Sequence, residues 1–569
     1  MPPLFVPLVC ALLAGNSHAQ VEPTLPGEVE SLRKIGQFQG GFFGDIVADD
    51  GFGNALAALG DVDGDGIGDL AVGTPFADIG GPWRGGVWIL FLEADGSVRA
   101  WQRLSALDGE LPVPPLDFDR FGWSLAPLGD YDGDGVPDLA VGASGRADGG
   151  PDRGAVHLLM LRPDGTVHTQ HTISSTSGGF GGTLLDGDGF GSALANLGDL
   201  DGDGELDLAV SARLDDDGGL SAGAFWMLFL DGAGGVLHEQ KVGPLDGGLQ
   251  AEIDPLDFFA SSLAAIGDVN GDGLVDLVAG APNDSDDGLA HGAVYVLLMA
   301  ADGTVQRTQK INHLVGGLDT QLDAIDTFGT AVAGVGDVNA DGVPDLAVSA
   351  PFDDDFAPGT EFEGSARGAV YLLFLERDGS VGSRHKISDS AAQFEGQLLG
   401  VSGFGSGLAA LGDVDGDGTP DLAAGMSAEP GFGGQPKPAV WRVTLHGATW
   451  TDLGGGFGAA PGALAPTLTG LGSLVPGEPL QIAWRGRVPH APLVLVSGLS
   501  FLGVPLAGGV LGPAPQQLVF TQSDASGARV VSARWPGDAT PGVSLYLQAW
   551  ELDRGGVVAA SGTLRAEAP

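Results

Sequence analysis

Acidic residues recur in this 569-residue chain at a spacing that suits a divalent cation. Six segments have the form of DVDGDGIGDL, the first of them, and begin at Asp61, Asp130, Asp199, Asp268, Asp337 and Asp413. Each places oxygen-bearing side chains at positions 1, 3, 5 and 9, and we expect the backbone carbonyl of position 7 to turn inward as well. Glycine at position 6, and at position 4 in five of the six, lets the segment curl until these oxygens converge.

Oxygen ligands in a flexible loop indicate calcium, because magnesium demands a strict octahedron and resists dehydration. We therefore predict up to six bound Ca²⁺ ions. An EF-hand is excluded, since position 12 is Val or Ala in every segment and not a bidentate Glu. The predicted ligands are Asp61, Asp63, Asp65, Ile67, Asp69, Asp130, Asp132, Asp134, Val136, Asp138, Asp199, Asp201, Asp203, Glu205, Asp207, Asp268, Asn270, Asp272, Leu274, Asp276, Asp337, Asn339, Asp341, Val343, Asp345, Asp413, Asp415, Asp417, Thr419 and Asp421.

The acidic segments would be strained without a cation. Four carboxylates about 5 Å apart repel one another by roughly 5 kcal/mol even at the permittivity of water. We expect an unoccupied segment to spread, so calcium is predicted to stabilise the fold. Whether the ions also meet a ligand, or only rigidify the fold, is left open by the sequence.

The acidic segments belong to a repeat of about 69 residues that is typical of a β-propeller. Successive segments start 69, 69, 69, 69 and 76 residues apart, and a Phe stands nine residues before each. In the fourth unit, β-branched and aromatic runs at 263–268, 276–282, 292–300 and 304–311 predict four strands, the last two joined by an Asp-Gly turn. Four strands per unit, repeated radially, indicate an all-β propeller.

The ends of the repeat predict how the ring closes. The sixth unit has three strand signals, the third at 439–447, and lacks the fourth. A matching strand, SLRKIGQ, precedes the first unit at residues 31–37. We predict that this strand completes the last blade, which removes two exposed sheet edges and gives six blades.

The recurring Phe-Gly, D-x-D-x-D-G-x-x-D-L and Gly-Ala-Pro or Gly-Ala-Val motifs resemble the FG-GAP repeats of integrin alpha-chain β-propellers. The resemblance covers about residues 31–450. It implies a calcium-binding extracellular propeller that recognises or adheres to other molecules. Integrin propellers have seven blades, which makes seven the alternative to the six counted here.

The rest of the chain divides into short segments. Residues 1–19, with an apolar run and the only cysteine, Cys10, are typical of a secretory signal peptide, so we predict a secreted or cell-surface protein. Residues 20–30 form an N-terminal segment before the propeller at 31–450. A Gly- and Ala-rich linker is expected at 451–466, and short apolar runs over 467–569 predict a β-sandwich-like domain. No later stretch is long and apolar enough to form a membrane span.

Charge and motif content narrow the function. The 25 basic and 74 acidic residues give a net charge of −49, which disfavours nucleic acid as a partner. The ten histidines are scattered without a zinc motif, and no catalytic constellation is recognisable. We predict a non-enzymatic recognition module for an extracellular protein or glycan ligand. A polysaccharide-active or other propeller enzyme, and a purely structural surface protein, are the alternatives.

Two further features give weaker hypotheses about where a ligand binds. An acidic residue stands two positions before five of the six Phe residues, and these acids would ring the central channel or simply bond to their own backbone; they are Asp50, Asp119, Asp188, Asp257 and Asp326. The fifth unit also carries seven extra residues within 351–370, in an acidic loop expected on the same face.

Overall fold

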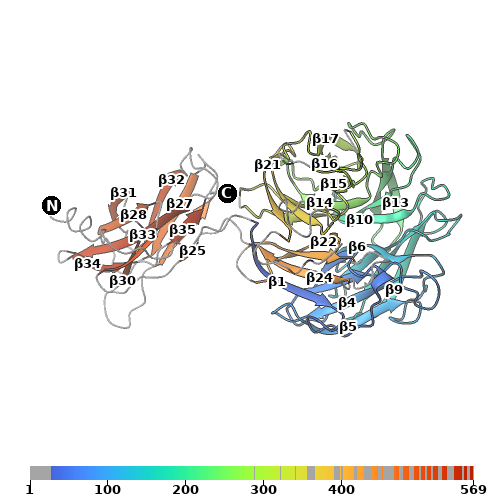
Figure 1. The fold of residues 1–569 in the computed structure, drawn as a ribbon, viewed down its shortest axis with the longest axis horizontal. Coiled ribbons are helices and arrows are strands. Elements are labelled where there is room, and N and C mark those ends of the chain that lie inside the picture. Colours follow the sequence, from blue (N-terminus) through green and yellow to red (C-terminus); the bar gives the residue numbers. More distant parts are fainter. Residues whose placement is uncertain are drawn as a thin grey trace. The chain divides into compact units, whose positions relative to one another are not determined.

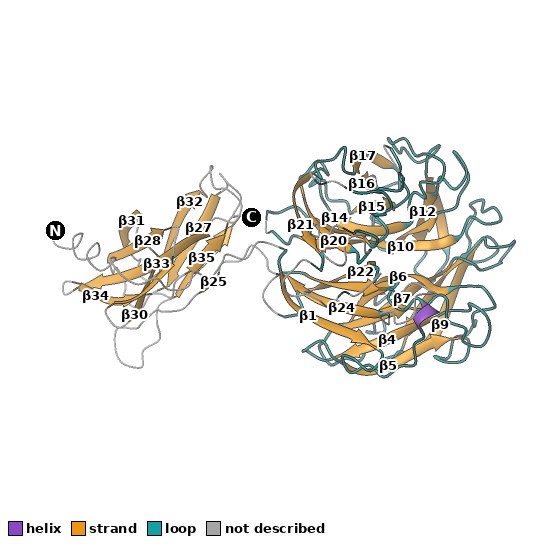
Figure 2. Ribbon diagram, viewed as in Figure 1, coloured by secondary structure: helices purple, strands orange, loops and turns teal. Residues whose placement is uncertain are grey.

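The computed structural model describes residues 27–445, except 287–288, 319, 321, 340, 355–365, 390–397, 399–401, 416–418 and 428–437, and beyond residue 445 the backbone of the strands only. The chain separates into two compact units, Gly27–Gly447 and a second that contains Ala448–Pro569. Figure 2 shows that strands dominate both, with a single short helix, η1 (Ala48–Asp50), among the described residues. The predicted signal peptide and most of the predicted N-terminal segment lie outside the described residues.

Six four-stranded antiparallel sheets make up the first unit, which confirms the all-β propeller and the count of six blades (Figure 1). The first three blades are β2 (Leu56–Gly60), β3 (Asp69–Gly73), β4 (Gly86–Leu92) and β5 (Val98–Ser105); β6 (Phe121–Gly129), β7 (Asp138–Ala143), β8 (Ala155–Leu161) and β9 (Val167–Ser174); and β10 (Phe190–Gly198), β11 (Asp207–Ala212), β12 (Ala224–Leu230) and β13 (Val236–Val242).

The other three blades repeat the same order of strands. They are β14 (Ser262–Gly267), β15 (Asp276–Ala281), β16 (Ala293–Met299) and β17 (Val305–Ile311); β18 (Val332–Gly336), β19 (Asp345–Ala350), β20 (Ala369–Leu375) and β21 (Val381–Ile387); and β22 (Phe404–Gly412), β23 (Asp421–Met426), β24 (Ala439–Leu445) and β1 (Val29–Gly36).

The ring closes through the N-terminal strand, as the sequence predicts. Strand β1 pairs antiparallel with β24, from Val29 opposite Leu445 to Gly36 opposite Ala439. The first strands of neighbouring blades contact one another all the way round, and β22 of the last blade contacts β2 of the first. With β1 in place all six blades have four strands and the ring is closed, so seven blades are excluded.

The recurrent Phe fixes each blade to the one before it. Phe52, Phe121, Phe190, Phe259, Phe328 and Phe404 are at most 1% exposed. The backbone of Phe121 pairs in parallel with Gly85, the residue directly before β4, the third strand of the preceding blade. A Cβ on Gly85, whose φ is +78°, would lie 2.1 Å from the Phe121 carbonyl oxygen, so only glycine fits this close approach.

Apolar packing between blades supplies the core. Strands β3, β7, β11, β15, β19 and β23 are buried along their whole length, as are most third strands. Phe225, Met227 and Phe229 of β12 pack with Leu277 of β15 and Tyr295 of β16 in the next blade. Each such side chain stabilises the fold by about 1.5–3 kcal/mol relative to an exposed one. The loops between strands are thus held by a rigid frame.

Strands beyond residue 450 form antiparallel sheets of their own. They are β25 (Thr451–Asp452), β26 (Thr467–Gly472), β27 (Pro479–Arg485), β28 (Pro492–Gly498), β29 (Phe501–Leu506), β30 (Gly509–Pro513), β31 (Gln517–Gln522), β32 (Ala528–Arg534), β33 (Ser544–Asp553), β34 (Gly556–Ala560) and β35 (Leu564–Glu567). One sheet has the order β25-β35-β33-β28-β31, with β34 beside β33, and another has the order β26-β27-β32. The expected linker thus begins with a short strand, because Thr451 and Asp452 pair with β35.

Candidate functional site

The six acidic segments form the loops that join the first and second strands of the blades, and we call them metal loops one to six. Position 1 directly follows the first strand, and position 9 is the first residue of the second strand. The loops curl at glycines with positive φ, such as Gly64 at +79° and Gly66 at +90° in loop one. A Cβ at either glycine would meet no atom within 4 Å, so backbone conformation and not space selects glycine there.

The position-9 carboxylates are buried anchors between strands. In loop four, Asp276 accepts N–H bonds from Val269 at 3.0 Å and from Met299 of β16 at 3.0 Å. The same two bonds recur in loops one, two, five and six, and Asp207 of loop three accepts the first from Leu200. Burial raises the pKa of Asp276 to about 6, and these N–H bonds act in the opposite direction.

Position-9 residues of the other loops show the same effect of burial. The pKa is raised to about 6 for Asp69, Asp138 and Asp207, and to about 8 for Asp345, where the nearby charge of Asp341 adds to burial. A positive ion close to these carboxylates would favour their charged form. The five shifts thus share one main cause, the burial of the carboxylates.

Carboxylates at positions 1 and 5 are held by the loop backbone. Asp61 accepts N–H bonds from Gly64 at 2.7 Å, Asp65 at 2.9 Å and Gly66 at 2.7 Å. Oxygen Oδ1 of Asp65 accepts the N–H of Ile67 at 2.9 Å. These donors offset part of the repulsion expected from four bare carboxylates.

The remaining oxygens converge as a hard cation requires. Carboxylate oxygens of positions 1, 3 and 9 lie within 4.8 Å of one another in loops one, two and six, as do those of positions 1, 3 and 5 in loop three. Oxygens bound at 2.3–2.6 Å on opposite sides of Ca²⁺ would be about 5 Å apart. In loop one, Oδ1 of Asp63 is also buried without a hydrogen-bond partner. The donor set and its spacing therefore fit calcium.

Loops four and five differ because position 3 is Asn. Asn270 donates its amide Nδ2–H to Oδ2 of Asp272 at 2.9 Å, and Asn339 does the same to Asp341 at 2.9 Å. The amide oxygen of each accepts the backbone N–H of the residue at position 5. In loop six, Asp417 at position 5 lies outside the described residues.

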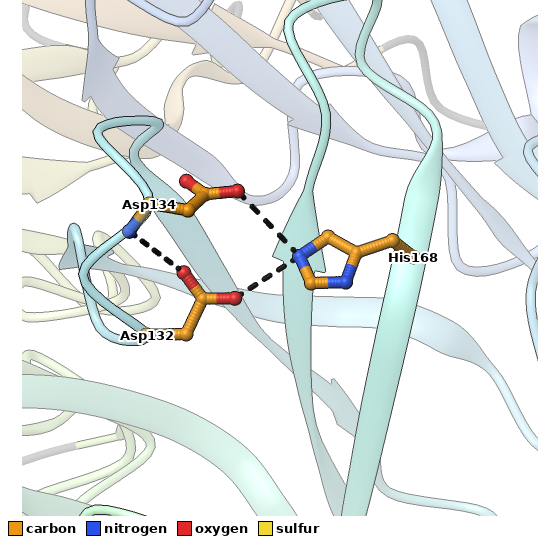
Figure 3. Close-up of side chains that lie close together, drawn as sticks. All are labelled: Asp132, Asp134 and His168. Carbon is orange, nitrogen blue, oxygen red and sulfur yellow. Dashed lines mark hydrogen bonds and ion pairs between the residues drawn. The ribbon is translucent and has the colours of Figure 1, made fainter.

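In loops one and two, a basic side chain from the fourth strand faces the acids. Arg99 of β5 places Nη2 at 2.5 Å from Asp63 Oδ2 and 2.8 Å from Asp65 Oδ2. His168 of β9 places Nε2 at 3.0 Å from Asp132 Oδ2 and 3.8 Å from Asp134 Oδ2 (Figure 3). The sequence does not predict either contact, because the partners are 34–36 residues apart. Aligning the six fourth strands would have placed both residues at one position.

The acids that precede the Phe residues do not ring an open channel. Asp119, Asp188, Asp257 and Asp326 are at most 4% exposed, and each accepts the backbone N–H of the residue three positions earlier. Asp50 accepts the N–H of Val47 in the same way. They are turn residues that bond to their own backbone, which was the simpler of the two interpretations.

A pocket of about 350 Å³ lies where the first strands of all six blades begin, at the ends opposite the metal loops. We call it the axial pocket. Blade-specific side chains replace the small repeat residues at two of its positions. Trp123 stands where the other blades have Asn, Ser or Thr, and Arg213 stands where they have Pro or Ser. The described lining contains no acidic residue.

Arg213 lies against aromatic rings and has no acidic partner among the described residues. Its guanidinium carbon is 5.1 Å from the centre of the Trp123 ring and 5.9 Å from that of Phe258. Burial, and the nearby positive charge of Arg120, lower the pKa of Arg213. The acidic insertion of the fifth blade, residues 355–365, lies outside the described residues. In the described part of this very acidic chain, the axial pocket is therefore a site of positive charge.

Four of the repeat units match the model of a known protein family. Residues 52–90, 121–159, 259–297 and 328–373 match the FG-GAP repeat. The chain is 35% identical over 176 residues to integrin alpha-PS5 of Drosophila melanogaster, covering 30% of this chain and 15% of that protein. It is 32% identical over 247 residues to integrin alpha pat-2 of Caenorhabditis briggsae, covering 41% and 18%.

This chain is also similar to a protein whose name is that of an enzyme. The chain is 37% identical over 174 residues to phosphatidylinositol-glycan-specific phospholipase D of Bos taurus, covering 30% of this chain and 19% of that protein. The matched stretches thus span less than a fifth of each of these three relatives. The crystal structure of a beta-1,2-glucanase from Parabacteroides distasonis matches 42% of this chain and 34% of its own chain, at 12% sequence identity. The TM-score is 0.11, so this match says nothing about the fold.

Proposed function

We propose that this chain, which carries FG-GAP repeats and folds as a six-bladed propeller, is a calcium-stabilised recognition module outside the cell or at its surface. Its similarity to integrin alpha chains supports adhesion or recognition as the general role. Within the described residues, no helix has the length and apolar content needed to cross a membrane. Calcium would sit in the metal loops, held by the oxygens of positions 1, 3, 5 and 9 with the position-7 carbonyls.

The axial pocket would bind a ligand that carries a carboxylate. One observation supports this most strongly: Arg213 is half-buried in the pocket wall, over the Trp123 ring, with no acidic partner among the described residues. A partly buried guanidinium that lacks a counter-charge is costly, and a bidentate carboxylate would compensate it. The hydroxyls of Ser192, Ser261 and Thr330 donate to backbone carbonyls, so Arg213 would be the main donor to a bound carboxylate.

Recognition fits the pocket better than catalysis. The described lining offers Arg213 but no Asp, Glu, His, Cys, Lys or Tyr that could exchange a proton or attack a substrate at neutral pH. The similarity to a phospholipase D covers less than a fifth of that enzyme. A non-enzymatic module is therefore the proposal.

A binding screen tests the proposal. Calcium-loaded protein is applied to arrays of acidic and neutral glycans and of peptides with and without free carboxylates. We expect acidic members of one array to be retained, and R213Q to lose at least tenfold in affinity. R162Q, whose Arg162 pairs with Glu110 on an exposed strand end, is the matched control and should bind normally. Retention of neutral ligands, or equal binding by R213Q, would contradict the proposal.

A further inference from the structure

We propose that metal loop two, together with His168, binds one transition-metal ion of the zinc class. Asp132 and Asp134 are on the loop between β6 and β7, and His168 is on β9 of the same blade. Their ligand atoms lie within 4.8 Å of one another. Figure 3 shows the two carboxylates and the imidazole directed toward a common point. The site shares two residues with the proposed calcium loop but does not require that calcium binds there.

The three groups are oriented before any ion arrives. Oδ1 of Asp132 accepts the N–H of Asp134 at 3.2 Å, and Oδ1 of Asp134 accepts the N–H of Val136 at 2.9 Å. These bonds leave Oδ2 of each carboxylate directed at the imidazole. On the ring, Nδ1 is 2.9 Å from the Thr169 hydroxyl. A bond to the second ring nitrogen is how proteins usually fix the orientation of a metal-binding histidine.

The Nε2 atom of His168 has nothing else to bind. It is closed off from solvent and makes no hydrogen bond of acceptable geometry, and the carboxylate oxygens at 3.0 and 3.8 Å are its partners. Ligand atoms around tetrahedral Zn²⁺ are about 3.3–3.5 Å apart. The observed spacings lie on either side of that distance, so small movements of both carboxylates would match it.

The presence of nitrogen in the donor set selects the ion. Imidazole favours zinc, copper, nickel and iron, whereas calcium and magnesium favour oxygen alone. With three protein ligands, water would fill the fourth position of a tetrahedral zinc ion. We therefore infer that zinc displaces calcium from Asp132 and Asp134 at this loop.

Only one blade offers this donor set. At the position of His168, immediately after the first residue of the fourth strand, the other blades have Arg99, Leu237, Gln306, Gly382 and Glu30. None of these supplies a neutral nitrogen ligand. The inferred stoichiometry is therefore one zinc-class ion per chain. This site could not be predicted from the sequence, because the histidines form no metal-binding motif. Only the folding of the blade brings His168 close to the loop.

Calorimetric titration with Zn²⁺ tests the inference on the full chain, kept in millimolar Ca²⁺ so that the other loops stay filled. We expect one ion to bind the wild type and the affinity to fall at least 100-fold in H168Q. In the same proteins, Co²⁺ should give visible absorption bands of a tetrahedral site that H168Q abolishes. The double variant H291Q/H313Q is the matched control, because its two imidazole rings are 4.8 Å apart and are the nearest alternative.

Each other outcome overturns the inference. If H168Q binds Zn²⁺ as tightly as the wild type, His168 is not a ligand. If the double variant alone loses the ion, the site is the His291–His313 pair. If the wild type binds no Zn²⁺, His168 is only an ion-pair partner of the loop. None of these results bears on calcium at the other five loops or on the axial pocket, so this inference and the proposed function fail separately.

Discussion

At the scale of single residues, the position-9 aspartates link three parts of each blade. In loop four, Asp276 begins the second strand and accepts N–H bonds from the start of the metal loop and from the third strand. Each of its two oxygens thus accepts one N–H bond and keeps a second lone pair that a cation can use. The motif D-x-D-x-D-G-x-x-D therefore combines a curled group of oxygens with a buried anchor that holds the curl in place.

Replacing this anchor should destabilise the protein even without calcium. In D276N, the amide nitrogen must face one of the two N–H donors, so we expect a loss of roughly 1–3 kcal/mol in the free energy of unfolding. Urea unfolding in excess chelator measures this loss apart from metal binding. D246N, at an exposed turn residue, is the control and should change stability by less than 0.5 kcal/mol. A loss seen only with calcium present would mean that Asp276 is simply a ligand.

Arg99 should weaken calcium binding at metal loop one. Its guanidinium already pairs with Asp63 and Asp65, two of the proposed ligands. Because this pairing must break before calcium can take up those oxygens, R99L should bind calcium at this loop a few-fold more tightly. Calcium titration of R99L beside R307L measures the change, since Arg307 is exposed and near Asp378 instead. Unaltered affinity in R99L would contradict this prediction.

His157 should make stability depend on pH. This side chain is fully buried beside Arg146, and burial first, then that charge, lowers its pKa to about 4. Between pH 6.5 and 4 the unfolded chain therefore binds the proton more readily than the folded one, so stability is present above 6.5 and is lost as pH falls. The loss is about 3 kcal/mol. Unfolding curves of the wild type and of H157Q at pH 7 and pH 4 measure this loss of stability. If both proteins lose the same stability between pH 7 and pH 4, His157 is not its cause.

The metal loops can be predicted from the sequence, but the side chains that surround them cannot. Ligand types and spacing lie within nine residues, so a pattern predicts them. The contact of Arg99 with Asp63, and the stacking of Arg213 on Trp123, join residues 36 and 90 positions apart. Only the pairing of strands within and between blades brings such residues together. The charge and chemistry around each loop, and the axial pocket, therefore needed the structure.

At the scale of elements, the fourth strand carries the variation between blades. A basic residue near its end lies over an aromatic ring of the third strand in five blades, as Lys310 does over Tyr295 at 5.5 Å. In the second blade this pair becomes Thr172 and His157, which are joined at 3.0 Å. Blade two thus differs from the others both at this pair and at His168. The blades therefore differ from one another at specific positions of the third and fourth strands.

Ring closure by strand β1 is also testable at this scale. Ile35 of β1 is 1% exposed and packs with Val440 of β24 and Val72 of β3. Truncating it to Ala should cost about 2–5 kcal/mol in the free energy of unfolding. Ile311 occupies the same place in β17, where the fourth strand follows the third by a hairpin, so I311A is the matched comparison. An I35A protein that is as stable as wild type, beside a destabilised I311A, would show that β1 does not close the ring.

The strands themselves were largely predictable from the sequence. The four strands predicted in the fourth unit correspond to β14, β15, β16 and β17, and their ends differ by one residue at most. Beyond residue 466 the apolar runs QIAWRG, LVLVSG, LVFTQ, ARVVSARW and SLYLQAWEL overlap β27, β28, β31, β32 and β33, respectively, but they miss β26, β29, β30, β34 and β35. Those missed strands contain Gly or Pro or are short, as in Gly509–Pro513, so their local signal resembles that of a turn.

At the scale of the whole molecule, charge and closure act together. A net charge of −49 destabilises any compact state through self-repulsion, and the only cysteine, Cys10, leaves no internal disulfide to oppose it. Six divalent ions would neutralise about a quarter of that charge at one end of the blades. The axial pocket, at the other end, would stay available for a ligand. Calcium would thus stabilise the propeller without occupying the surface proposed for recognition.

Thermal unfolding with and without calcium tests this account most directly. If each loop binds calcium with a dissociation constant one tenth of the free concentration, six loops stabilise the protein by about 8 kcal/mol. For a propeller of about 420 residues, this corresponds to a drop in Tm of about 9 °C after exhaustive chelation. We predict that drop, its reversal on adding calcium back, and a stoichiometry close to six ions per chain. An unchanged Tm, or a stoichiometry of one or two, would contradict the account.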